Sequence, residues 1–421
     1  MTTIAWPRAP ARPARPNLIE SLAFGAAVFL MLIYSQGWTM PLTGGGDETS
    51  ESGLLRAMFL PAYAVAVGLM ALTPWTVVKG AVRQPFLIAL MMIVALSLLW
   101  SVSPDQTSRR VFAVAFTTLG GIVLAARFSW ATLAEVMAAT LAILAVFCLL
   151  FGLFVPSLGR MTELFPGAWR GVWQEKNSLG DNMALGVVIC ASAGMLSPAR
   201  RWLWWGFSVL CLVLVVLSTS KTSLVALALG VGALFFVALV RRGPVAGVAA
   251  TWAAVVGVGL IAAVIVFASD AVFGLLGKDA TLTGRTKIWA GVLRQIEQRP
   301  WLGYGYAAVW DETDRWGPLA WIVKDSGFRP HHAHNSWLEQ WLGIGIPGLV
   351  AWGLFYMQTM VTAIIAVYRD KGAYLAFPFL IVFTLTSLTE SIAVVYHDMR
   401  WVIFVALAVK LALPDPAEKV A

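Results

Sequence analysis

The sequence predicts an all-α, polytopic integral membrane protein with about twelve transmembrane helices. Apolar residues make up 59% of the 421-residue chain, and Asp, Glu, Lys and Arg only 12%, about half of the ~25% typical of soluble domains. Apolar runs recur along the chain, and about 20 such residues are enough to cross the roughly 30 Å hydrocarbon core as a helix. The net charge of +8 therefore fits a membrane protein with positively charged inner loops better than a protein that binds nucleic acid.

Hydropathy places the expected spans in order along the chain. A first transmembrane region, 18–268, holds nine of them: 18–36, 55–73, 85–101, 110–127, 131–154, 178–196, 202–219, 222–240 and 246–268. A second region, 343–413, holds three: 343–368, 373–391 and 398–413. Residues 1–17 are expected to be a disordered N-terminus, and residues 414–421 a short C-terminal tail.

The distribution of charge predicts the orientation of these spans. Lys79, Arg83 and Arg127 lie in loops on the same side as both termini, whereas the loop after the first span contains Asp47 and Glu48. Because Lys and Arg favour the cytoplasmic side, both termini are expected to be cytoplasmic. Residues 269–342 then form one long loop outside the cytoplasm. Its aromatic, glycine and periodic apolar residues indicate that this loop is folded and contains amphipathic helices.

Two cations on the outer side are unusual, and each has two readings. Lys221 lies in the only polar break between spans seven and eight, where it either snorkels to anchor a turn or meets an anionic, membrane-anchored ligand. Arg285 opens a predicted amphipathic helix and projects among its apolar residues, where free backbone N–H groups also favour anions. Since a buried cation is costly unless paired, Arg285 is either a structural salt-bridge residue or an anion ligand. The apolar face of that helix is predicted to carry Ile288, Trp289, Val292, Leu293 and Ile296.

The third unusual residue is His334, in a cluster that holds three of the four histidines of the chain. If a helix starts here, His334 shares an apolar face with Trp337 and Trp341. His332 and Asn335 would then make a polar pocket around it, although a histidine on such a face can also be a satisfied core residue. A metal site formed by the histidines is the weaker alternative, because no carboxylate stands at a ligand spacing, and none is predicted.

Four short stretches carry a family resemblance: 173–180, 218–224, 283–289 and 332–335. The last continues with nine residues and then Gly345-Ile-Pro-Gly348. Across roughly residues 85–365 this pattern resembles the O-antigen ligase and polysaccharide polymerase superfamily of bacterial membrane proteins. The forms Ser-Lys-Thr, Gly-Arg-Thr and Lys-Asn-Ser-Leu-Gly look closest to its exopolysaccharide polymerase branch.

The resemblance implies a lipid-dependent (GT-C-like) glycosyltransferase of the bacterial inner membrane, with a periplasmic active site. Its donor and acceptor would be oligosaccharides carried on undecaprenyl diphosphate, and it would need no cofactor. The family's catalytic histidine falls on His334, and its diphosphate-binding cations fall on Lys221 and Arg285. The ligases typically have Arg at the position of Lys221, and Lys cannot bind phosphate in a bidentate manner. Membrane lipids are expected partners, and other polysaccharide assembly and export proteins are conceivable ones.

The physical chemistry of the residues agrees with this implication. Lys221 and Arg285 could neutralise the leaving diphosphate, and His334, with an unperturbed pKa near neutrality, could act as general base. Direct attack by the acceptor would invert the anomeric centre. Lys176 and Asn177 are expected either to complete the cavity or to form a helix-start turn. Four aromatic residues could either stack on sugar rings or anchor the membrane interface: Trp289, Tyr304, Tyr306 and Trp310.

Two other functions remain open from the sequence. A ligase would use the same donor but transfer the finished glycan to lipid A core or to protein. A lipid-linked sugar transporter or flippase is the alternative of a different class. Transporters often place ionisable residues at the bilayer midplane within paired repeats. We expect neither here, because the sequence shows no internal repeat and the spans appear nearly free of charge, with Glu135 as an exception.

Overall fold

The computed structural model describes residues 17–44, 53–162, 165–267, 285–310, 314–413 and 415. Predictions for residues 1–16, for the part of the long loop at 269–284 and for most of the C-terminal tail lie outside this range. The regular elements of the described residues are all helices, and one isolated β-bridge joins Arg160 to Trp169. The all-helical fold class is thus confirmed.

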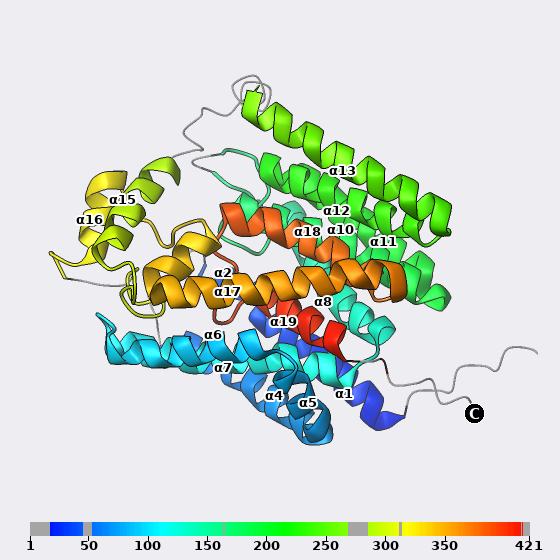
Figure 1. Ribbon diagram of the computed structural model, residues 1–421, viewed down its shortest axis with the longest axis horizontal. Helices are drawn as coiled ribbons and strands as arrows, with labels where there is room; N and C mark the ends of the chain where they lie inside the picture. Colours follow the sequence, from blue (N-terminus) through cyan, green and yellow to red (C-terminus); the bar gives the residue numbers. More distant parts are fainter. Residues whose placement is uncertain are drawn as a thin grey trace, which may run out of the picture.

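The helices follow one another closely along the chain (Figure 1). The first half contains α1 (Leu18–Tyr34), α2 (Thr39–Thr43), α3 (Gly53–Ala57), α4 (Leu60–Leu72), α5 (Pro74–Val82), α6 (Pro85–Leu96), η1 (Ser97–Leu99), α7 (Pro104–Arg127), α8 (Trp130–Phe154), α9 (Pro156–Gly159) and α10 (Lys176–Leu196). The second half contains η2 (Pro198–Arg200), α11 (Arg201–Ser218), α12 (Lys221–Val240), α13 (Pro244–Phe267), α15 (Arg285–Gln298), α16 (Pro318–Ser326), α17 (Ser336–Arg369), α18 (Ala373–Thr389) and α19 (Met399–Ala412).

Seven of the described helices are long and apolar enough to cross a membrane, and eight if the pair 74–82 and 85–99, bent by 88°, forms one span. Residues 18–34, 244–260 and 373–389 form shorter apolar helices. A multi-pass membrane protein is therefore confirmed, while the length criterion supports fewer spans than the twelve predicted. Each predicted span does contain a helix, but a helix of 14 residues such as α19 measures only about 21 Å at 1.5 Å per residue.

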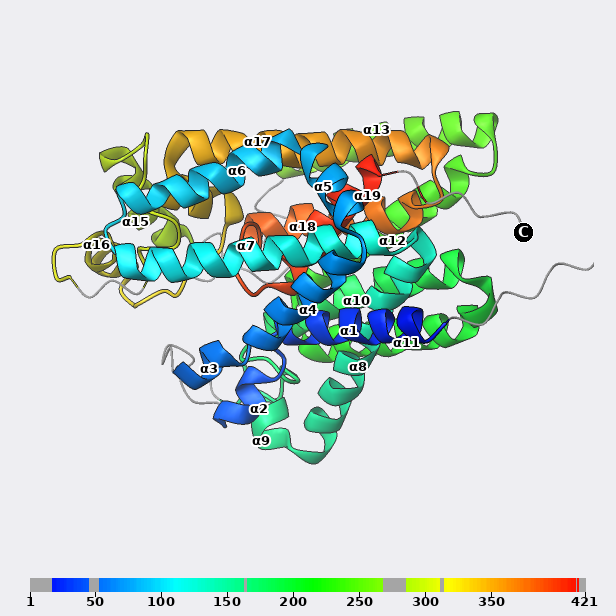
Figure 2. The ribbon, with the colours of Figure 1, turned by 90° about the horizontal axis from the view of Figure 1, so that it is seen from below.

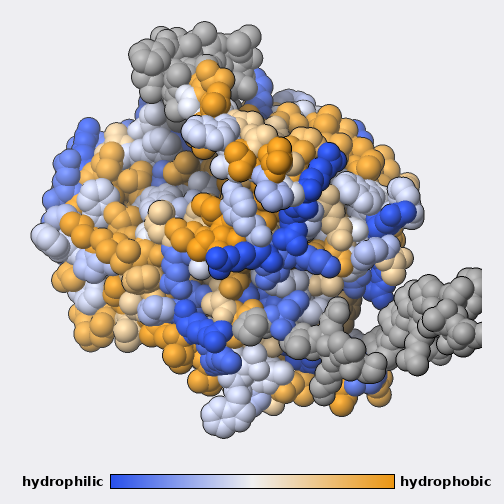
Figure 3. Space-filling view, turned by 45° about the vertical axis from the view of Figure 1, so that its right-hand side comes forward, coloured by the Kyte–Doolittle hydropathy of each residue, from blue (hydrophilic) through white to orange (hydrophobic). Residues whose placement is uncertain are grey.

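Helix α10 forms the centre of the bundle. It packs against α8, α11, α12 and α18, and nearly all of its residues are buried. The outer helices instead expose large apolar side chains, such as Trp75 on α5 and Trp252 on α13. In the space-filling view, hydrophobic residues surround a central group of hydrophilic ones (Figure 3). This distribution is the one expected where lipid covers the sides of a bundle.

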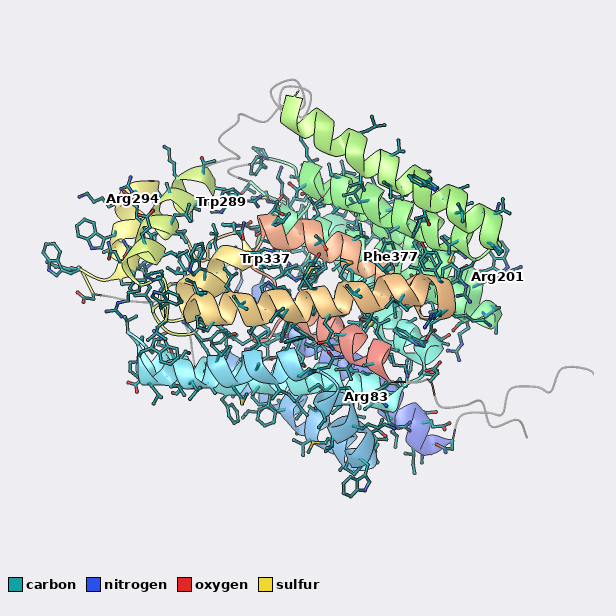
Figure 4. All side chains as sticks on the ribbon, in the orientation of Figure 1. Arg83, Arg201, Trp289, Arg294, Trp337 and Phe377 are labelled. Atoms are coloured by element: carbon teal, nitrogen blue, oxygen red, sulfur yellow. The ribbon has the colours of Figure 1, made fainter. Side chains whose placement is uncertain are left out.

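The described loops gather at two ends of the bundle. At one end, which we call the α15 end, α15 and α16 lie together (Figures 1 and 2). The loop before α7 joins them there, because Val102 N donates to Tyr304 O at 2.9 Å. At the other end, Arg200 forms a 2.8 Å ion pair with Glu135, and Arg201 marks this end in Figure 4.

Helix α17 differs from its prediction in an informative way. It starts at Ser336 rather than at residue 343, and it is interrupted at Gly345, whose φ is 67°. A Cβ atom on Gly345 would lie 2.0 Å from Trp301 O. Here the 300–305 segment runs against the helix, with Tyr304 N and Gly305 N donating to Leu342 O and Gly343 O at 3.0 and 2.8 Å. The first glycine of the Gly-x-x-Gly motif therefore permits a close backbone crossing.

The predicted amphipathic helix is present as α15. Ile288, Val292 and Ile296 are buried, but Leu293, predicted for the same face, is 41% exposed. Lys287 lies on the exposed side. The buried face packs against α16 and α17, which fixes the start of α15 next to the histidine cluster. Trp289 Nε1, for example, donates to Ala333 O at 2.9 Å.

Candidate functional site

Arg285, His334 and Glu390 meet at the α15 end. Arg285 is the first residue of α15, His334 lies two residues before α17, and Glu390 follows the last residue of α18. The Arg285 Nη2 atom lies 2.5 Å from Glu390 Oε1, and His334 Nδ1 lies 2.8 Å from Glu390 Oε2. Arg285 thus forms a salt bridge, and this salt bridge lies inside the candidate site. The geometry is therefore compatible with both interpretations of Arg285, as a structural salt-bridge residue and as an anion ligand.

The backbone at and after Glu390 is held in place by the start of α17. Ser336 Oγ donates to Glu390 O at 2.9 Å and accepts hydrogen bonds from Ile392 N and Ala393 N at 2.9 and 3.1 Å. Ser336 is fully buried, so its hydroxyl replaces the backbone pairing that this segment lacks. The residue after the His-Asn motif therefore positions Glu390.

The electrostatics define the state of Glu390 and the tautomer of His334. Burial acts to raise the pKa of Glu390, but the hydrogen bond from His334 and the positive charges of His334 and Arg285 outweigh it and lower the pKa to about 2. An ionised carboxylate only accepts hydrogen bonds, so Nδ1 of His334 carries the hydrogen. In the neutral form of the His334 ring, Nε2 is then the atom that can accept a proton, and the side chain is 22% exposed.

The surroundings of His334 differ from the helical face that the sequence predicts. Its φ is 49°, so it precedes the helix and does not share the face of Trp337 and Trp341. Asn335 is the N-cap: its Oδ1 accepts from Trp337 N and Leu338 N at 2.9 and 3.1 Å. This amide already has a structural role, because its Nδ2 also donates to Leu388 O at 3.3 Å.

His332 lies against His334, with the two ring centroids 4.0 Å apart. Its Nδ1 accepts a hydrogen bond from His334 N at 3.2 Å. Burial, together with the charge of His334, lowers the pKa of His332 to about 3. The ring is therefore neutral at physiological pH, and its Nε2 carries the hydrogen.

Lys176, Asn177 and Lys221 form a neighbouring group at the starts of α10 and α12. Lys176 Nζ lies 3.5 Å from Thr219 Oγ1 and 3.6 Å from the centroid of the Phe165 ring. Asn177 Oδ1 accepts from Ser220 Oγ at 3.0 Å. Lys221 is exposed and close enough to Lys176 for the two charges to interact. The structure thus brings all three predicted residues together, although Asn177 is also part of a helix-start network.

Asp181, buried within α10, connects this group to Glu390. It accepts a 2.7 Å hydrogen bond from Ser223 Oγ on α12, and its charge interacts with those of Glu390, Arg400 and Arg285. The approach of α12 depends on Gly180, because a Cβ atom there would lie 2.5 Å from Ser223 Oγ. The last glycine of the Lys-Asn-Ser-Leu-Gly motif therefore allows the starts of α10 and α12, which carry Lys176 and Lys221, to approach each other.

Three charged residues of this site were missed by the sequence reasoning: Asp181, Glu390 and Arg400. The expectation of nearly charge-free spans is wrong at Asp181 and Arg400, which lie in α10 and α19. Arg400 is paired with Asp398 at 2.5 Å. An ionisable residue in a membrane helix is rare and often functional, so Asp181 and Arg400 could have been found by that criterion alone.

Three residues of the site could hold a metal ion by distance alone. Ligand atoms of His332, His334 and Glu390 lie within 4.8 Å of one another. Glu390, however, is already engaged by Arg285 and His334, and the adjacent guanidinium would repel a cation. The donor set therefore fits an ion-pair network better than a metal centre.

Comparisons with known proteins agree with the predicted resemblance. A sequence model of the O-antigen ligase family matches residues 206–353, a range that includes Lys221, Arg285 and His334. The exopolysaccharide production protein ExoQ of Rhizobium meliloti (strain 1021) is 28% identical over 276 residues, which is 63% of this chain. The match spans 62% of the length of ExoQ. The resemblance expected from the four motifs is thereby confirmed.

Proposed function

We propose that this protein polymerises undecaprenyl-diphosphate-linked oligosaccharide repeat units into exopolysaccharide on the periplasmic side of the bacterial inner membrane. The matched family and the name of ExoQ support this substrate class. The observation that carries the proposal is that one carboxylate, Glu390, contacts both His334 and Arg285. It couples a candidate general base to a candidate diphosphate ligand within one network.

The proposed topology follows from charge. The end opposite the α15 end carries Arg83, Arg200 and Arg241 between helices, as cytoplasmic loops do. In this proposal both termini are cytoplasmic, and residues 269–342 form the periplasmic loop between transmembrane regions 18–268 and 343–413. The shorter helices complete a GT-C-like bundle of about twelve spans. Two of them, α18 and α19, flank the segment that carries Glu390.

The proposed step is a direct displacement. The hydroxyl oxygen of the acceptor sugar attacks the anomeric carbon of the donor sugar, and the bond from that carbon to the diphosphate oxygen breaks. The electron pair leaves with the diphosphate, and the hydroxyl proton moves to His334 Nε2. Glu390 stabilises the resulting imidazolium through its bond to Nδ1, as a carboxylate orients a catalytic histidine. Attack from the opposite face inverts the anomeric centre.

The leaving diphosphate requires cations at the membrane surface. Lys221 and Lys176 stand at adjacent helix starts, and Arg285 has N–H groups beyond the one that contacts Glu390. Their charges would stabilise the negative charge that develops on the leaving oxygen. No metal or nucleotide is needed for this step. His332 and Asn335 would support substrate binding through their positions beside His334.

The test is an assay of the purified full-length protein in lipid nanodiscs with undecaprenyl-diphosphate-linked repeat units alone. We expect longer lipid-linked chains from the wild type and none from His334→Ala. The variant should reach the membrane at wild-type levels and elute as one species. Full activity of His334→Ala would reject the catalytic role of His334, and transbilayer movement of the lipid without elongation would indicate a flippase.

A ligase is the second candidate, because the matched family is described as O-antigen ligase. The donor and the displacement would be unchanged, and only the acceptor would differ. The same assay separates the two functions. A ligase gives no product from lipid-linked repeat units until lipid A core or an acceptor protein is added.

A further inference from the structure

A cavity of about 240 Å³ lies beside His332 and is separate from the cationic group. Its wall is formed by Gln36 after α1, the first part of α7, the 306–310 loop, residues 331–332, the start of α17 and residues 391–396. None of Lys176, Lys221 and Arg285 contributes to this wall. The 331–332 segment and Ser391, next to Glu390, form the side that faces the catalytic residues. His332, which lines the cavity, contacts His334, and Arg285 contacts Glu390, so the His334–Glu390 pair connects the cavity wall to Arg285.

We propose that this cavity is the acceptor subsite, which binds the terminal pyranose residue of the acceptor glycan. The inference rests on the proposed function, because a transferase of this kind must hold a second glycan whose hydroxyl reaches His334. The donor diphosphate occupies the side of Lys176, Lys221 and Arg285. The acceptor then enters from the opposite side of the His334–Glu390 pair.

The chemistry of the wall suits a sugar. Three aromatic residues, Tyr306, Trp310 and Tyr396, line it together with amide, carboxylate and imidazole groups and the guanidinium of Arg110. Aromatic rings offer flat apolar faces with a polar edge, which match the C–H faces and hydroxyl rim of a pyranose. Small-molecule sites combine such apolar walls with a few placed polar groups. At about 240 Å³ the cavity is somewhat smaller than the ~300–1,000 Å³ typical of such sites, which favours a single terminal sugar residue over a long chain.

The polar groups of the wall are fixed before any ligand binds. Glu339 accepts hydrogen bonds from Trp310 Nε1 and from Ser391 Oγ. Tyr306 OH donates to Val394 O at 2.6 Å, and Gln340 Nε2 donates to Ala393 O at 3.0 Å. These contacts join three separate segments into one rigid frame. A preorganised frame lowers the entropy cost of binding.

Backbone strain concentrates around the same cavity. Gln36, Ala307 and Val394 all line it and have φ values of 54°, 52° and 55°. This region costs non-glycine residues of order 1–3 kcal/mol each, and such residues cluster at ligand sites. For the β-branched Val394 it is a genuine outlier. The proposed base, His334, has a φ of 49°. Residues with a strained backbone are therefore found both in the cavity wall and at the base.

One residue of the cavity wall contacts the proposed base. His332 lines it, and its ring lies 4.0 Å from that of His334. With its Nδ1 occupied by His334 N, neutral His332 presents an Nε2–H donor for a sugar hydroxyl. A pyranose bound there places another hydroxyl beside the exposed edge of His334, from which the proton passes to Nε2.

The experiment measures binding of two separate probes to the full-length protein in nanodiscs. One probe is the lipid-free repeat oligosaccharide released from lipid-linked repeat units, and the other is undecaprenyl diphosphate without sugar. Val395→Trp fills the cavity, and Tyr396→Leu removes one aromatic face. Val361→Trp is the matched control, because Val361 lies 48% exposed on α17, away from the cavity. Lys221→Ala perturbs only the donor side.

We expect Val395→Trp and Tyr396→Leu to bind the oligosaccharide at least tenfold more weakly than the wild type and to bind undecaprenyl diphosphate unchanged. Val361→Trp should bind both normally, and Lys221→Ala should lose affinity only for the diphosphate. Retained diphosphate binding shows that a variant is folded. The proposal is overturned if the wild type does not bind the oligosaccharide or if both cavity variants bind it normally. Failure of chain elongation in the wild type would instead reject the polymerase function, and the binding measurements would still decide whether the cavity takes a sugar.

Discussion

Glu390 accepts a 2.8 Å hydrogen bond from His334 Nδ1 through Oε2, while its other oxygen contacts Arg285. Glu390→Gln keeps the shape of this residue but removes the charge that stabilises a protonated His334. The amide can also donate to Nδ1, which would favour the wrong tautomer. We expect chain elongation to slow by about 10²- to 10⁴-fold, the range for general-base catalysis. Initial rates at saturating lipid-linked donor would measure this effect.

The matching test of position is Glu390→Asp, which keeps the charge on a shorter side chain. We expect it to recover part of the activity that Glu390→Gln loses. Equal rates for wild type and Glu390→Gln would contradict a role of this carboxylate in the reaction.

The contrast between His334 and Glu390 shows what the sequence could and could not predict. Hydropathy predicted a span at each of the seven described helices that are long and apolar enough to cross a membrane. The motifs singled out Lys221, Arg285 and His334 as candidates. Both signals are local in the chain. Glu390 lies at the end of an apolar segment, and its importance depends on a contact across 56 sequence positions. The backbone of His334 was also mispredicted, because nothing in the residues around it indicates a φ of 49°. Only the packing of α15, α17 and α18 brings these groups together.

Arg285 and Lys287 lie on the same helix but on different sides, which allows a matched comparison. Arg285 is buried and paired, whereas Lys287 is exposed. We expect Arg285→Ala to weaken binding of undecaprenyl diphosphate and to lower kcat, because it removes a diphosphate ligand and leaves Glu390 less neutralised. Lys287→Ala should bind and elongate at wild-type rates. Equal losses in both variants would indicate a nonspecific effect of charge on membrane association.

Gly345 and Gly353 are both in α17, yet only Gly345 has a positive φ. A Cβ at Gly345 would lie 2.0 Å from Trp301 O, whereas a Cβ at Gly353 would meet only Trp337 at 3.7 Å. We expect Gly345→Ala to destabilise the protein by about 2 kcal/mol or more, because the 300–305 segment cannot remain in place. Gly353→Ala should be neutral or stabilising by up to about 1 kcal/mol. Thermal unfolding in detergent would measure both, and equal Tm values would contradict this account of the motif.

His332 predicts a pH dependence of stability. Burial and the positive charges of His334, Arg400 and His331 lower its pKa from 6.5 to about 3, although Glu390 acts against them. Between these values the unfolded chain binds a proton that the folded protein does not, so stability falls as the pH falls from 6.5 towards 3. The contribution of Glu390, whose pKa is lowered from 4.5 to about 2, is lost only below about pH 4.5. Between pH 6.5 and 4.5 His397 contributes as well, because burial also lowers its pKa from 6.5 to about 3, so a variant is needed to separate the contribution of His332.

The variant that tests this is His332→Gln, which keeps a hydrogen-bonding side chain but cannot titrate. We expect its Tm to fall less steeply than that of the wild type between pH 6.5 and 4.5. In terms of the free energy of unfolding, the slopes against pH of the two proteins should differ by at most about 1.4 kcal/mol per pH unit, the value for one proton. Parallel curves for the two proteins would show that His332 does not remain neutral in the folded state.

The pairing of Arg285 with Glu390 also predicts independence from divalent metal. A metal ion bound by His332, His334 and Glu390 would have to displace the guanidinium that lies 2.5 Å from Glu390. It would also engage the base whose free nitrogen must accept a proton. Since Lys176, Lys221 and Arg285 can neutralise the diphosphate, we expect chain elongation to continue at its full rate after dialysis against EDTA. Loss of activity that Mg²⁺ or Mn²⁺ restores would contradict this, and would mean that the diphosphate is neutralised by a metal ion rather than by these side chains.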